Sequence, residues 1–403
     1  MDHPAMKNVS RRKFLKASAA GASALAFPSI VGSGVLGQDS AVRIAVVGCG
    51  GRGSQDLNSL VAVPGAKVIA VCELRDDRLE KAKKIAYTTN PNGYKDFRKM
   101  LETEKPDGVT AVVEVQNHAK VICPILEMGY NCFSEKPLDT TVDKVDQIVE
   151  TARKTKKWVQ VGFQRRYIEG HRAIVNEIHA EKYGKVYALQ AHWHFFDPQG
   201  PADADWDGGR LIEQACHHMD AMAWVMKNQP PLRCVSIGKA PNGTRPGVAH
   251  LSEAGSATAF EFPGNVLFSY THLMGVPGTI GEDEGPSTKP DEQNFINEKL
   301  WIFCEQAAYD LTRSMRYLRD RSKKKERVGA ASRGYVEGTN EEFASFVDCI
   351  RTGKMPYSNH ETARVSTLMS MMGRMAMYDR ESKSFTPRVI EWKDLKSRTD
   401  STA

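Results

Sequence analysis

The chain has 403 residues, of which 41% are hydrophobic and 26% are charged, and this is the composition of an ordinary globular protein. The formal net charge of +6 arises mostly at the N-terminal end, because residues 1–37 hold five Lys or Arg residues and a single Asp. The rest of the chain has 50 basic and 48 acidic residues, a net charge of +2. The balance gives no support for nucleic-acid binding, and the length is sufficient for two domains with a large buried core.

The N-terminal segment has the pattern of an export signal. Arg11 and Arg12 lie in a basic run that precedes an apolar stretch rich in Ala, Gly and Ser, from Ala17 to about Leu36. We therefore expect residues 1–37 to form a twin-arginine signal peptide, which sends an already folded protein to the periplasm or another extracytoplasmic space. The alternative is an uncleaved signal that anchors the protein, although the glycines and Pro28 make a poor spanning helix.

Residues 41–162 alternate between short apolar runs rich in β-branched residues and segments with helical periodicity. This alternation is typical of a doubly wound parallel sheet. Strands are predicted at residues 42–47, 67–72, 109–115, 131–134 and 158–162, and helices at 54–61, 76–86, 118–128 and 141–155.

A glycine-rich turn follows the first predicted strand and opens a helix. Gly48, Gly50 and Gly53 form a GxGxxG pattern, in which the glycines permit the tight turn, the close approach of a pyrophosphate, and close packing of helix on strand. Glu73 ends the second predicted strand, 20 residues beyond Gly53, where a carboxylate accepts from ribose hydroxyls and repels a 2′-phosphate. Residues 41–162 are therefore predicted to be a Rossmann domain that binds NAD rather than NADP. Arg78 lies close by in sequence and can contact a phosphate or stack on adenine.

Beyond residue 162 the pattern changes to strict alternation, which is typical of a mainly antiparallel sheet with one open face. We assign residues 163–390 to a substrate-binding α/β domain. Its predicted strands include 185–194, 256–262 and 265–272, and its predicted helices include 340–351 and 361–378.

Two segments suggest acid–base chemistry. Glu135, Lys136 and Pro137 follow a strand of the first domain, and the carboxyl end of such a strand faces the ligand crevice. Glu213 and His217 are four residues apart in an apparent helix, so a carboxylate on the same face can fix the tautomer of the imidazole. Spacing alone leaves a plain helix ion pair open as the alternative.

Cysteine and histidine patterns give no case for a metal or a disulfide framework. The eight cysteines form no CxxC pair, and several lie in apolar runs, so we expect buried free thiols. The pairs His192/His194 and His217/His218 have no third ligand at a recognisable spacing, and no metal site is predicted.

Five segments together resemble the Gfo/Idh/MocA family, which includes glucose–fructose oxidoreductase and inositol dehydrogenase. They are VGCGGRG at 47–53, VCE at 71–73, SEKPL at 134–138, VGFQRRY at 161–167 and LIEQACHHMD at 211–220. The resemblance spans most of residues 41–380. It implies a Rossmann domain joined to an α/β domain with an open sheet, and the catalytic roles fall on Lys136, His217 and Glu213.

The implied reaction is hydride transfer between a secondary alcohol carbon of a sugar or cyclitol and the nicotinamide. His217 would remove the hydroxyl proton while Lys136 donates a hydrogen bond to the same oxygen. Three departures from the family pattern stand out: Val113-Glu114 in place of the frequent Thr-Pro, Glu213 in place of Asp, and Ala215 in place of Gly.

The residues expected to contact the cofactor are Gly48, Gly50, Gly51, Arg52, Gly53, Glu73, Arg78, Asn117, His118, Glu135 and Gln164. Those expected to contact the substrate are Arg166, Tyr167, His194 and Trp206.

Two other functions remain open at this point: an NAD-dependent glycosidase that works by transient oxidation, and a protein that holds NAD without turnover. The family resemblance also implies a homo-oligomer formed through the open sheet. Because a twin-arginine substrate folds in the cytoplasm, where NAD is available, we expect the cofactor to be exported with the protein and tightly retained.

Overall fold

The computed structural model describes residues 41–195, 208–239, 254–274, 296–320, 322–330, 335–379, 382 and 384–395. The chain divides into two units, Met1–Val35 and Leu36–Ala403, and every described residue belongs to the second. The predicted signal, residues 1–37, and Trp206 lie outside the described residues. Within the described ranges no helix is long and apolar enough to cross a membrane.

The first half contains a six-stranded sheet in the order β3-β2-β1-β4-β5-β6, and every neighbouring pair is parallel. This confirms the predicted Rossmann fold. Its strands are β1 (Val42–Val47), β2 (Ala66–Cys72), β3 (Asn92–Tyr94), β4 (Gly108–Ala111), β5 (Cys132–Ser134) and β6 (Val159–Val161). Its helices are α2 (Gly51–Val61), α3 (Asp76–Ile85), α4 (Phe97–Glu104), α5 (His118–Glu127) and α6 (Val142–Thr155), with a 3-10 turn η1 (Val115–Asn117).

The central strands are apolar on both faces because helices cover both sides of the sheet. Every residue of β4, β5 and β6 is buried, and β1 leaves only Arg43 exposed. Side chains before the helices help to start them: Asp96 accepts from the main-chain N–H groups of Arg98 and Lys99 at α4, and Thr141 accepts from that of Lys144 at α6.

The second half is built on a nine-stranded sheet in the order β14-β13-β12-β11-β7-β10-β9-β8-β17. Only β7 and β10 pair in parallel, so the prediction of a mainly antiparallel sheet is confirmed. The strands are β7 (Val186–Phe195), β8 (Arg233–Lys239), β9 (Gly255–Phe262), β10 (Val266–Met274), β11 (Ile296–Cys304), β12 (Ala307–Asp310), β13 (Met315–Leu318), β14 (Glu326–Arg327) and β17 (Val389–Glu391). A short separate pair is formed by β15 (Tyr378–Asp379) and β16 (Ser384–Phe385).

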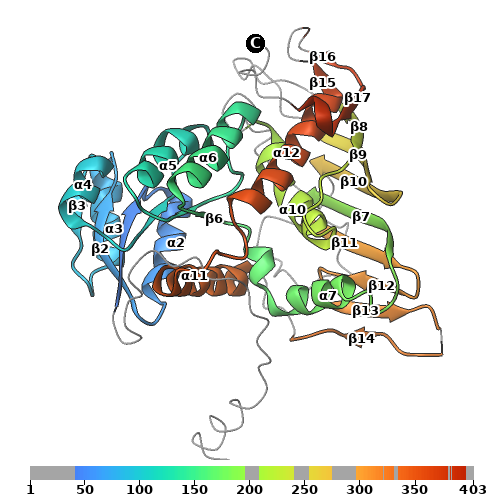
Figure 1. The fold of residues 1–403 in the computed structure, drawn as a ribbon, viewed down its shortest axis with the longest axis horizontal. Coiled ribbons are helices and arrows are strands. Elements are labelled where there is room, and N and C mark those ends of the chain that lie inside the picture. Colours follow the sequence, from blue (N-terminus) through green and yellow to red (C-terminus); the bar gives the residue numbers. More distant parts are fainter. Residues whose placement is uncertain are drawn as a thin grey trace, which may run out of the picture. The chain divides into compact units, whose positions relative to one another are not determined.

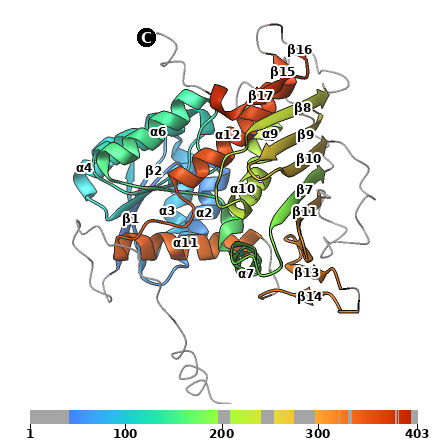
Figure 2. The ribbon, with the colours of Figure 1, turned by 45° about the vertical axis from the view of Figure 1, so that its right-hand side comes forward.

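Helices cover one face of this sheet and leave the other open (Figures 1 and 2). On the covered face Phe260, Phe268 and Tyr270 are at most 1% exposed, whereas Ile237 and Leu267 on the other face are 63% and 54% exposed. The covering helices are α10 (Cys216–Val225) and α12 (His360–Met377), and the remaining elements are the 3-10 turn η2 (Gln164–Tyr167), α7 (Glu169–His179), the short α9 (Arg210–Glu213), α11 (Tyr335–Thr352) and η3 (Trp392–Asp394).

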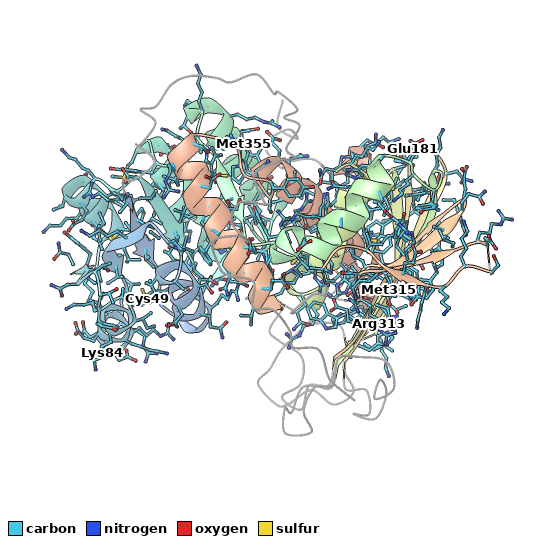
Figure 3. All side chains as sticks on the ribbon, turned by 90° about the horizontal axis from the view of Figure 1, so that it is seen from below. Cys49, Lys84, Glu181, Arg313, Met315 and Met355 are labelled. Carbon is cyan, nitrogen blue, oxygen red and sulfur yellow. The ribbon has the colours of Figure 1, made fainter. Side chains whose placement is uncertain are left out.

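One helix departs from the predicted domain boundary. Helix α11 lies within residues 163–390, which the sequence assigns to the substrate-binding domain. Its Phe343, Phe346 and Val347 pack into the same apolar cluster as the first-half strands β1 and β2. In Figure 3 it is the long helix that ends near Met355, and Cys49 of the glycine-rich turn is labelled on the first-half side. The C-terminal part of the chain therefore contributes to the core around the predicted cofactor turn.

Candidate active site

The glycine-rich turn has no room for side chains at two of its glycines. Gly48 has a φ of +84°, and a Cβ there would lie 2.1 Å from the carbonyl oxygen of Val112; a Cβ on Gly53 would lie 2.3 Å from the carbonyl oxygen of Gly48. A Cβ on Gly51 would meet nothing within 4 Å. The two crowded glycines therefore hold helix α2 against the end of β1, as a dinucleotide turn requires.

The carboxylate of Glu73 completes this turn. Its Oε2 accepts from the main-chain N–H of Cys49 at 2.9 Å, and its Oε1 accepts from that of Arg75 at 3.0 Å. The half-buried Arg78 lies beside Gly50, since a Cβ on that glycine would be 3.4 Å from its Nη1. The residues present fit an adenosine ribose and a phosphate, as predicted, although no sequence argument had anticipated the Glu73–Cys49 bond.

The Arg52 side chain contacts two carboxylates, those of Glu135 and Asp56. Its Nε donates to Glu135 Oε1 at 2.7 Å, and its Nη2 lies 3.1 Å from Asp56 Oδ1. Glu135 in turn accepts from the main-chain N–H of Lys136 at 2.9 Å through its other oxygen. The two predicted cofactor contacts Arg52 and Glu135 therefore bind each other in this structure.

Lys136 comes just after β5 and reaches across to the second half. Its Nζ donates to the main-chain oxygen of Glu213 at 2.9 Å and to Glu213 Oε1 at 3.1 Å, and the lysine side chain is 17% exposed. Burial by itself would lower the pKa of Lys136, but the negative charges of Glu213 and Glu135 outweigh it and raise that pKa. Lys136 is therefore an ammonium ion, and one of its three N–H donors remains for another acceptor.

The predicted helix around Glu213 and His217 is broken. Glu213 ends α9, and His217 lies in the first turn of α10, with Gln214 and Ala215 between the two helices. Gln214 and Ala215 keep helical backbone angles, and the Glu213 carboxylate contacts Lys136, with Oε1 3.1 Å from Nζ. The expected role of Glu213 in fixing the tautomer of His217 stays a prediction.

His217 is buried among aromatic rings. Its ring centroid lies 6.0 Å from that of Phe163 and 6.2 Å from that of Trp193, and its Nδ1 has no hydrogen-bond partner among the described residues. Burial and then the positive charges of Lys136 and Arg165 hold the pKa of His217 well below its usual range. At neutral pH the ring is uncharged and can accept a proton.

A buried ion-pair network lies beside His217 and includes the neighbouring residue, His218. Glu298 on β11 forms an ion pair with Arg165 of η2, and its Oε1 lies 2.8 Å from His218 Nε2. Burial lowers the pKa of His218 to about 4 despite the neighbouring carboxylate. Sequence reasoning missed Glu298 because β11 was not predicted, although Leu300, Ile302 and Cys304 alternate along it.

Three of the predicted substrate contacts have other roles in the structure. Arg166 is 1% exposed and makes a bidentate ion pair with Asp220 at 2.7 and 2.8 Å. Tyr167 is 3% exposed, and its hydroxyl oxygen accepts from the main-chain N–H of Ser358. His194 stacks on His192 and contacts Thr271. The first two are structural, and the fourth predicted contact, Trp206, lies outside the described residues.

Strand alternation explains the correction for His194. Neighbouring side chains on β7 point to opposite faces, and Trp193 is the one that contacts the rings of His217 and His218. His194 therefore lies on the open face, away from the reaction site. On this part of β7, Trp193 is therefore the side chain that faces the candidate reaction site.

Of the remaining predicted cofactor contacts, His118 contacts the loop that holds Lys136. His118 is buried, with Nδ1 3.0 Å from the carbonyl oxygen of Pro137 and Nε2 3.2 Å from that of Val113. It thereby links the end of β4 to the Lys136–Pro137 segment. Asn117 is half-buried at the end of η1, and Gln164 is buried at the start of η2.

All eight cysteines are free and buried, which confirms the expectation of buried thiols. Within the described ranges no group of three or more His, Cys, Asp or Glu residues could hold a metal ion.

Comparison with known proteins gives a family match for the first half. Residues 42–163 match GFO_IDH_MocA, described as the oxidoreductase family with an NAD-binding Rossmann fold. Among solved structures, the chain is similar to a probable dehydrogenase from Thermotoga maritima, with a TM-score of 0.69, 18% identity, and coverage of 88% of this chain and 100% of that one. A myo-inositol 2-dehydrogenase from Lactobacillus plantarum gives a TM-score of 0.66 at 18% identity, covering 87% and 99%. These likenesses show the fold of both halves.

Three curated relatives differ in how much of their length is shared. A glycosyl hydrolase family 109 protein of Akkermansia muciniphila is 28% identical over 123 residues, which are 29% of this chain and 26% of the relative. A myo-inositol 2-dehydrogenase of Thermotoga maritima is 20% identical over 352 residues, covering 85% and 98%. An inositol 2-dehydrogenase of Salmonella paratyphi B is 27% identical over 187 residues, covering 46% and 54%. The chain thus spans about a quarter of the first relative and about half of the third.

Proposed function

We propose that this protein is an NAD-dependent oxidoreductase acting on a secondary hydroxyl of a sugar or cyclitol, since residues 42–163 match the model of the oxidoreductase family GFO_IDH_MocA, with an NAD-binding Rossmann fold. The observation that supports it most directly is a charged lysine beside an uncharged histidine. The pKa of Lys136 is raised and that of His217 is lowered, although both groups are buried. Such a pair provides one hydrogen-bond donor and one base for the same oxygen.

His217 and Lys136 have different roles at the substrate hydroxyl. His217 accepts its proton, since the neutral ring has an available nitrogen. Lys136 donates its remaining N–H to the same oxygen and stabilises the negative charge that develops there. Glu213 holds the ammonium through two hydrogen bonds. Gly48, Gly53 and Glu73 would hold NAD, which when bound supplies the acceptor for the hydride that leaves the carbon.

Relatives named for inositol dehydrogenation favour a polyol as the substrate class. Trp193 beside His217 gives the site an aromatic surface suited to the apolar face of a sugar ring. The carboxylate of Glu73, beside the predicted cofactor turn, favours NAD over NADP. The apolar side chains on the open face, among them Ile237 and Leu267, support a homo-oligomer formed through that sheet.

The experiment is a screen of sugars, sugar acids and cyclitols with the purified enzyme, followed in a single turnover through the absorbance of its bound, reduced nicotinamide. A substrate-dependent rise that is lost in His217→Ala supports the proposal. If no polyol produces NADH and a chromogenic glycoside is cleaved instead, the activity belongs to the second candidate.

That second candidate is an NAD-dependent glycosidase, and one observation favours it: the match to the glycosyl hydrolase family 109 protein. The match covers only 26% of that relative, and it is limited to 123 residues, about the length of a dinucleotide-binding domain. Chromogenic glycosides in the presence of NAD separate the two candidates, because only a glycosidase releases the chromophore.

The basic and apolar segment at residues 1–37 supports export by the twin-arginine route. An exported enzyme that released NAD at each turnover would lose it, since free dinucleotide is scarce outside the cytoplasm. We therefore include a tightly retained cofactor in the proposal, regenerated in place by reduction of a second substrate or of an oxidised intermediate.

A further inference from the structure

A polar groove lies between helices α7 and α11, which are both on the face of the molecule that Figure 3 shows. Its volume is about 410 Å³, which is within the range of small-molecule sites. Helix α7 contributes Arg172 and Asn176 to the lining, and α11 contributes Glu341, Ser345 and Asp348. Nothing in the proposed reaction uses this groove.

The α11 residues of the groove share one face of their helix because of their spacing. Ser345 and Asp348 follow Glu341 by four and seven positions, which correspond to one and two helical turns. The three side chains therefore span about 10 Å along the helix axis. The other side of α11 is buried, since Glu342 is 0% exposed and Phe346 packs into the core. The packing of that side fixes the polar row that faces the groove.

The charged groups of the groove do not pair with one another. Arg172, Glu341 and Asp348 are exposed, and none of their side chains forms an ion pair or a hydrogen bond with another described residue. Elsewhere on the surface such groups do pair, as Arg153 and Glu361 do through two hydrogen bonds of 2.7 Å. The donors and acceptors that line the groove are therefore available to a ligand.

An aromatic ring at the groove is held by a buried partner. Tyr357 lines the groove and is 46% exposed. Its hydroxyl oxygen accepts from Trp224 Nε1–H at 2.8 Å, and the two ring centroids are 5.5 Å apart. Trp224 itself is 2% exposed and lies against the Arg166 guanidinium, 5.6 Å from its ring centroid. Tyr357 is thereby fixed in place, and its O–H is left to donate to a ligand.

The lining indicates the chemical class of that ligand. One guanidinium against two carboxylates disfavours an anion, and Arg172 disfavours a small cation. A sugar hydroxyl both donates and accepts, so the carboxylates of α11 can accept from it while Arg172 and Asn176 donate to it. The exposed ring of Tyr357 suits the apolar face of a sugar ring. A neutral polyhydroxylated ligand therefore satisfies every kind of group in the groove.

The groove is distinct from the candidate reaction site. Lys136 and His217 do not line it. The 3-10 turn η2 contributes to both places, because its Arg165 forms the ion pair with Glu298 beside His217, whereas its Tyr167 lines the groove. A ligand in the groove therefore contacts the opposite end of this turn from the one that joins the reaction site.

We propose that the groove between α7 and α11 is a second carbohydrate-binding site, which takes a neutral sugar or polyol unit. The ring of Tyr357 packs on the sugar, Arg172 and Asn176 donate to its hydroxyls, and the α11 carboxylates accept from them. This inference goes beyond the proposed function, because it is argued from the groove alone and uses neither NAD nor hydride transfer.

The test measures binding to the full chain by titration calorimetry, with glucose, maltose, cellobiose and myo-inositol as probes. The groove variants are Arg172→Ala and Asp348→Ala, which remove exposed side chains without ion pairs and so leave folding intact. The matched controls are Asn340→Ala, on α11 but outside the groove, and Asp394→Ala, an exposed acid of η3. All five proteins keep the reaction site, so only a groove site distinguishes them.

At least one probe sugar should show a binding event that is equal in wild type and in both controls. In Arg172→Ala and in Asp348→Ala this event should weaken about tenfold or more, since each variant loses a hydrogen bond from a charged group. Equal binding in all five proteins overturns the proposal, and so does the absence of binding by every probe sugar. Groove-dependent sugar binding by a protein that oxidises no polyol contradicts only the proposed function.

Inorganic phosphate and methylammonium, each added alone, test the two charged classes of ligand. Neither should bind in a way that depends on the groove residues. If one of them binds wild type, loses affinity in a groove variant and has no competitor among the sugars, the groove takes a charged ligand and the carbohydrate proposal is wrong. If the groove variants raise KM for an oxidised polyol by the same factor as they weaken its binding, the groove is part of the reaction site and the proposal of a second site is wrong.

Discussion

Replacing Lys136 should change both the rate and its pH dependence. Two of the three Nζ donors go to Glu213, at 2.9 and 3.1 Å, which leaves one for the substrate oxygen. Loss of one preorganised donor to a developing oxyanion costs about 10²–10³ in kcat, or about 3–4 kcal/mol. Lys136→Ala should therefore lower kcat by at least two orders of magnitude, and Lys136→Met by the same factor with less disturbance of packing.

The second effect concerns His217. Burial and the charges of Lys136 and Arg165 lower the pKa of His217, and the neutral ring is the active form, so activity is lost as pH falls through that lowered value. Removing the Lys136 charge withdraws one of these causes and leaves the Glu213 carboxylate with only the more distant Arg210, at 3.8 Å, as a charged partner among the described residues. Both changes raise the pKa of His217, so the acid limb of kcat/KM should move to higher pH in Lys136→Ala.

The assay is a pH profile of kcat/KM in the direction of NAD reduction, with NAD binding titrated separately. Lys136→Arg is the matched control, because it keeps the charge and so the acid limb, while its planar guanidinium does not reproduce the hydrogen-bond geometry. Near-normal turnover in Lys136→Ala would remove this residue from the mechanism. A rate loss without movement of the acid limb would show that Lys136 does not act on His217 electrostatically.

Three further predictions concern cofactor choice, folding and cofactor retention. Glu73→Ser with Leu74→Arg should shift preference from NAD toward NADP, and tighter binding of NADP by wild type in a titration would contradict the argument from the carboxylate. Arg166→Ala should destabilise the fold by about 3–5 kcal/mol, because it leaves the buried Asp220 charge unpaired. Denaturant unfolding measures this loss of stability. A normal unfolding midpoint together with a raised KM would indicate that Arg166 binds the substrate. Protein purified without added nucleotide and then denatured should release near-stoichiometric NAD(H), whereas empty protein that needs millimolar NAD for activity would refute retention.

Local patterns were sufficient for the parts of the fold that depend on short-range chemistry. The buried β-branched run of β1 and the glycines after it predicted the Rossmann start, and residues 48–53 adopt the expected turn. Strand β3 was missed because Asn92–Tyr94 is three residues long, contains a glycine and is mostly exposed. The third predicted strand, 109–115, ends at Ala111, because Val115–Asn117 forms a 3-10 turn that continues into α5.

The site could be predicted only where a single segment defines it. Lys136, His217 and Glu73 were found from their motifs, whereas Asp56 and Glu342 were not. Glu342 lies 286 positions after Asp56 in the chain, and nothing local marks a buried acid in a helix that has other charged residues. The packing of α11 against the first-half core leaves Glu342 fully buried, and such long-range packing has no signature in a single sequence.

The position of the Glu213 carboxylate bears on which buried group would act as the base in the proposed reaction. Burial lowers the pKa of Lys136 and of His217 alike, so burial by itself does not distinguish the two groups. The position of the Glu213 carboxylate separates them, because it lies 3.1 Å from Lys136 Nζ and stabilises the ammonium, whose charge then keeps the nearby imidazole neutral. In the proposed reaction Lys136 is therefore the hydrogen-bond donor and His217 the acceptor, so that the proton moves from the substrate hydroxyl to the histidine.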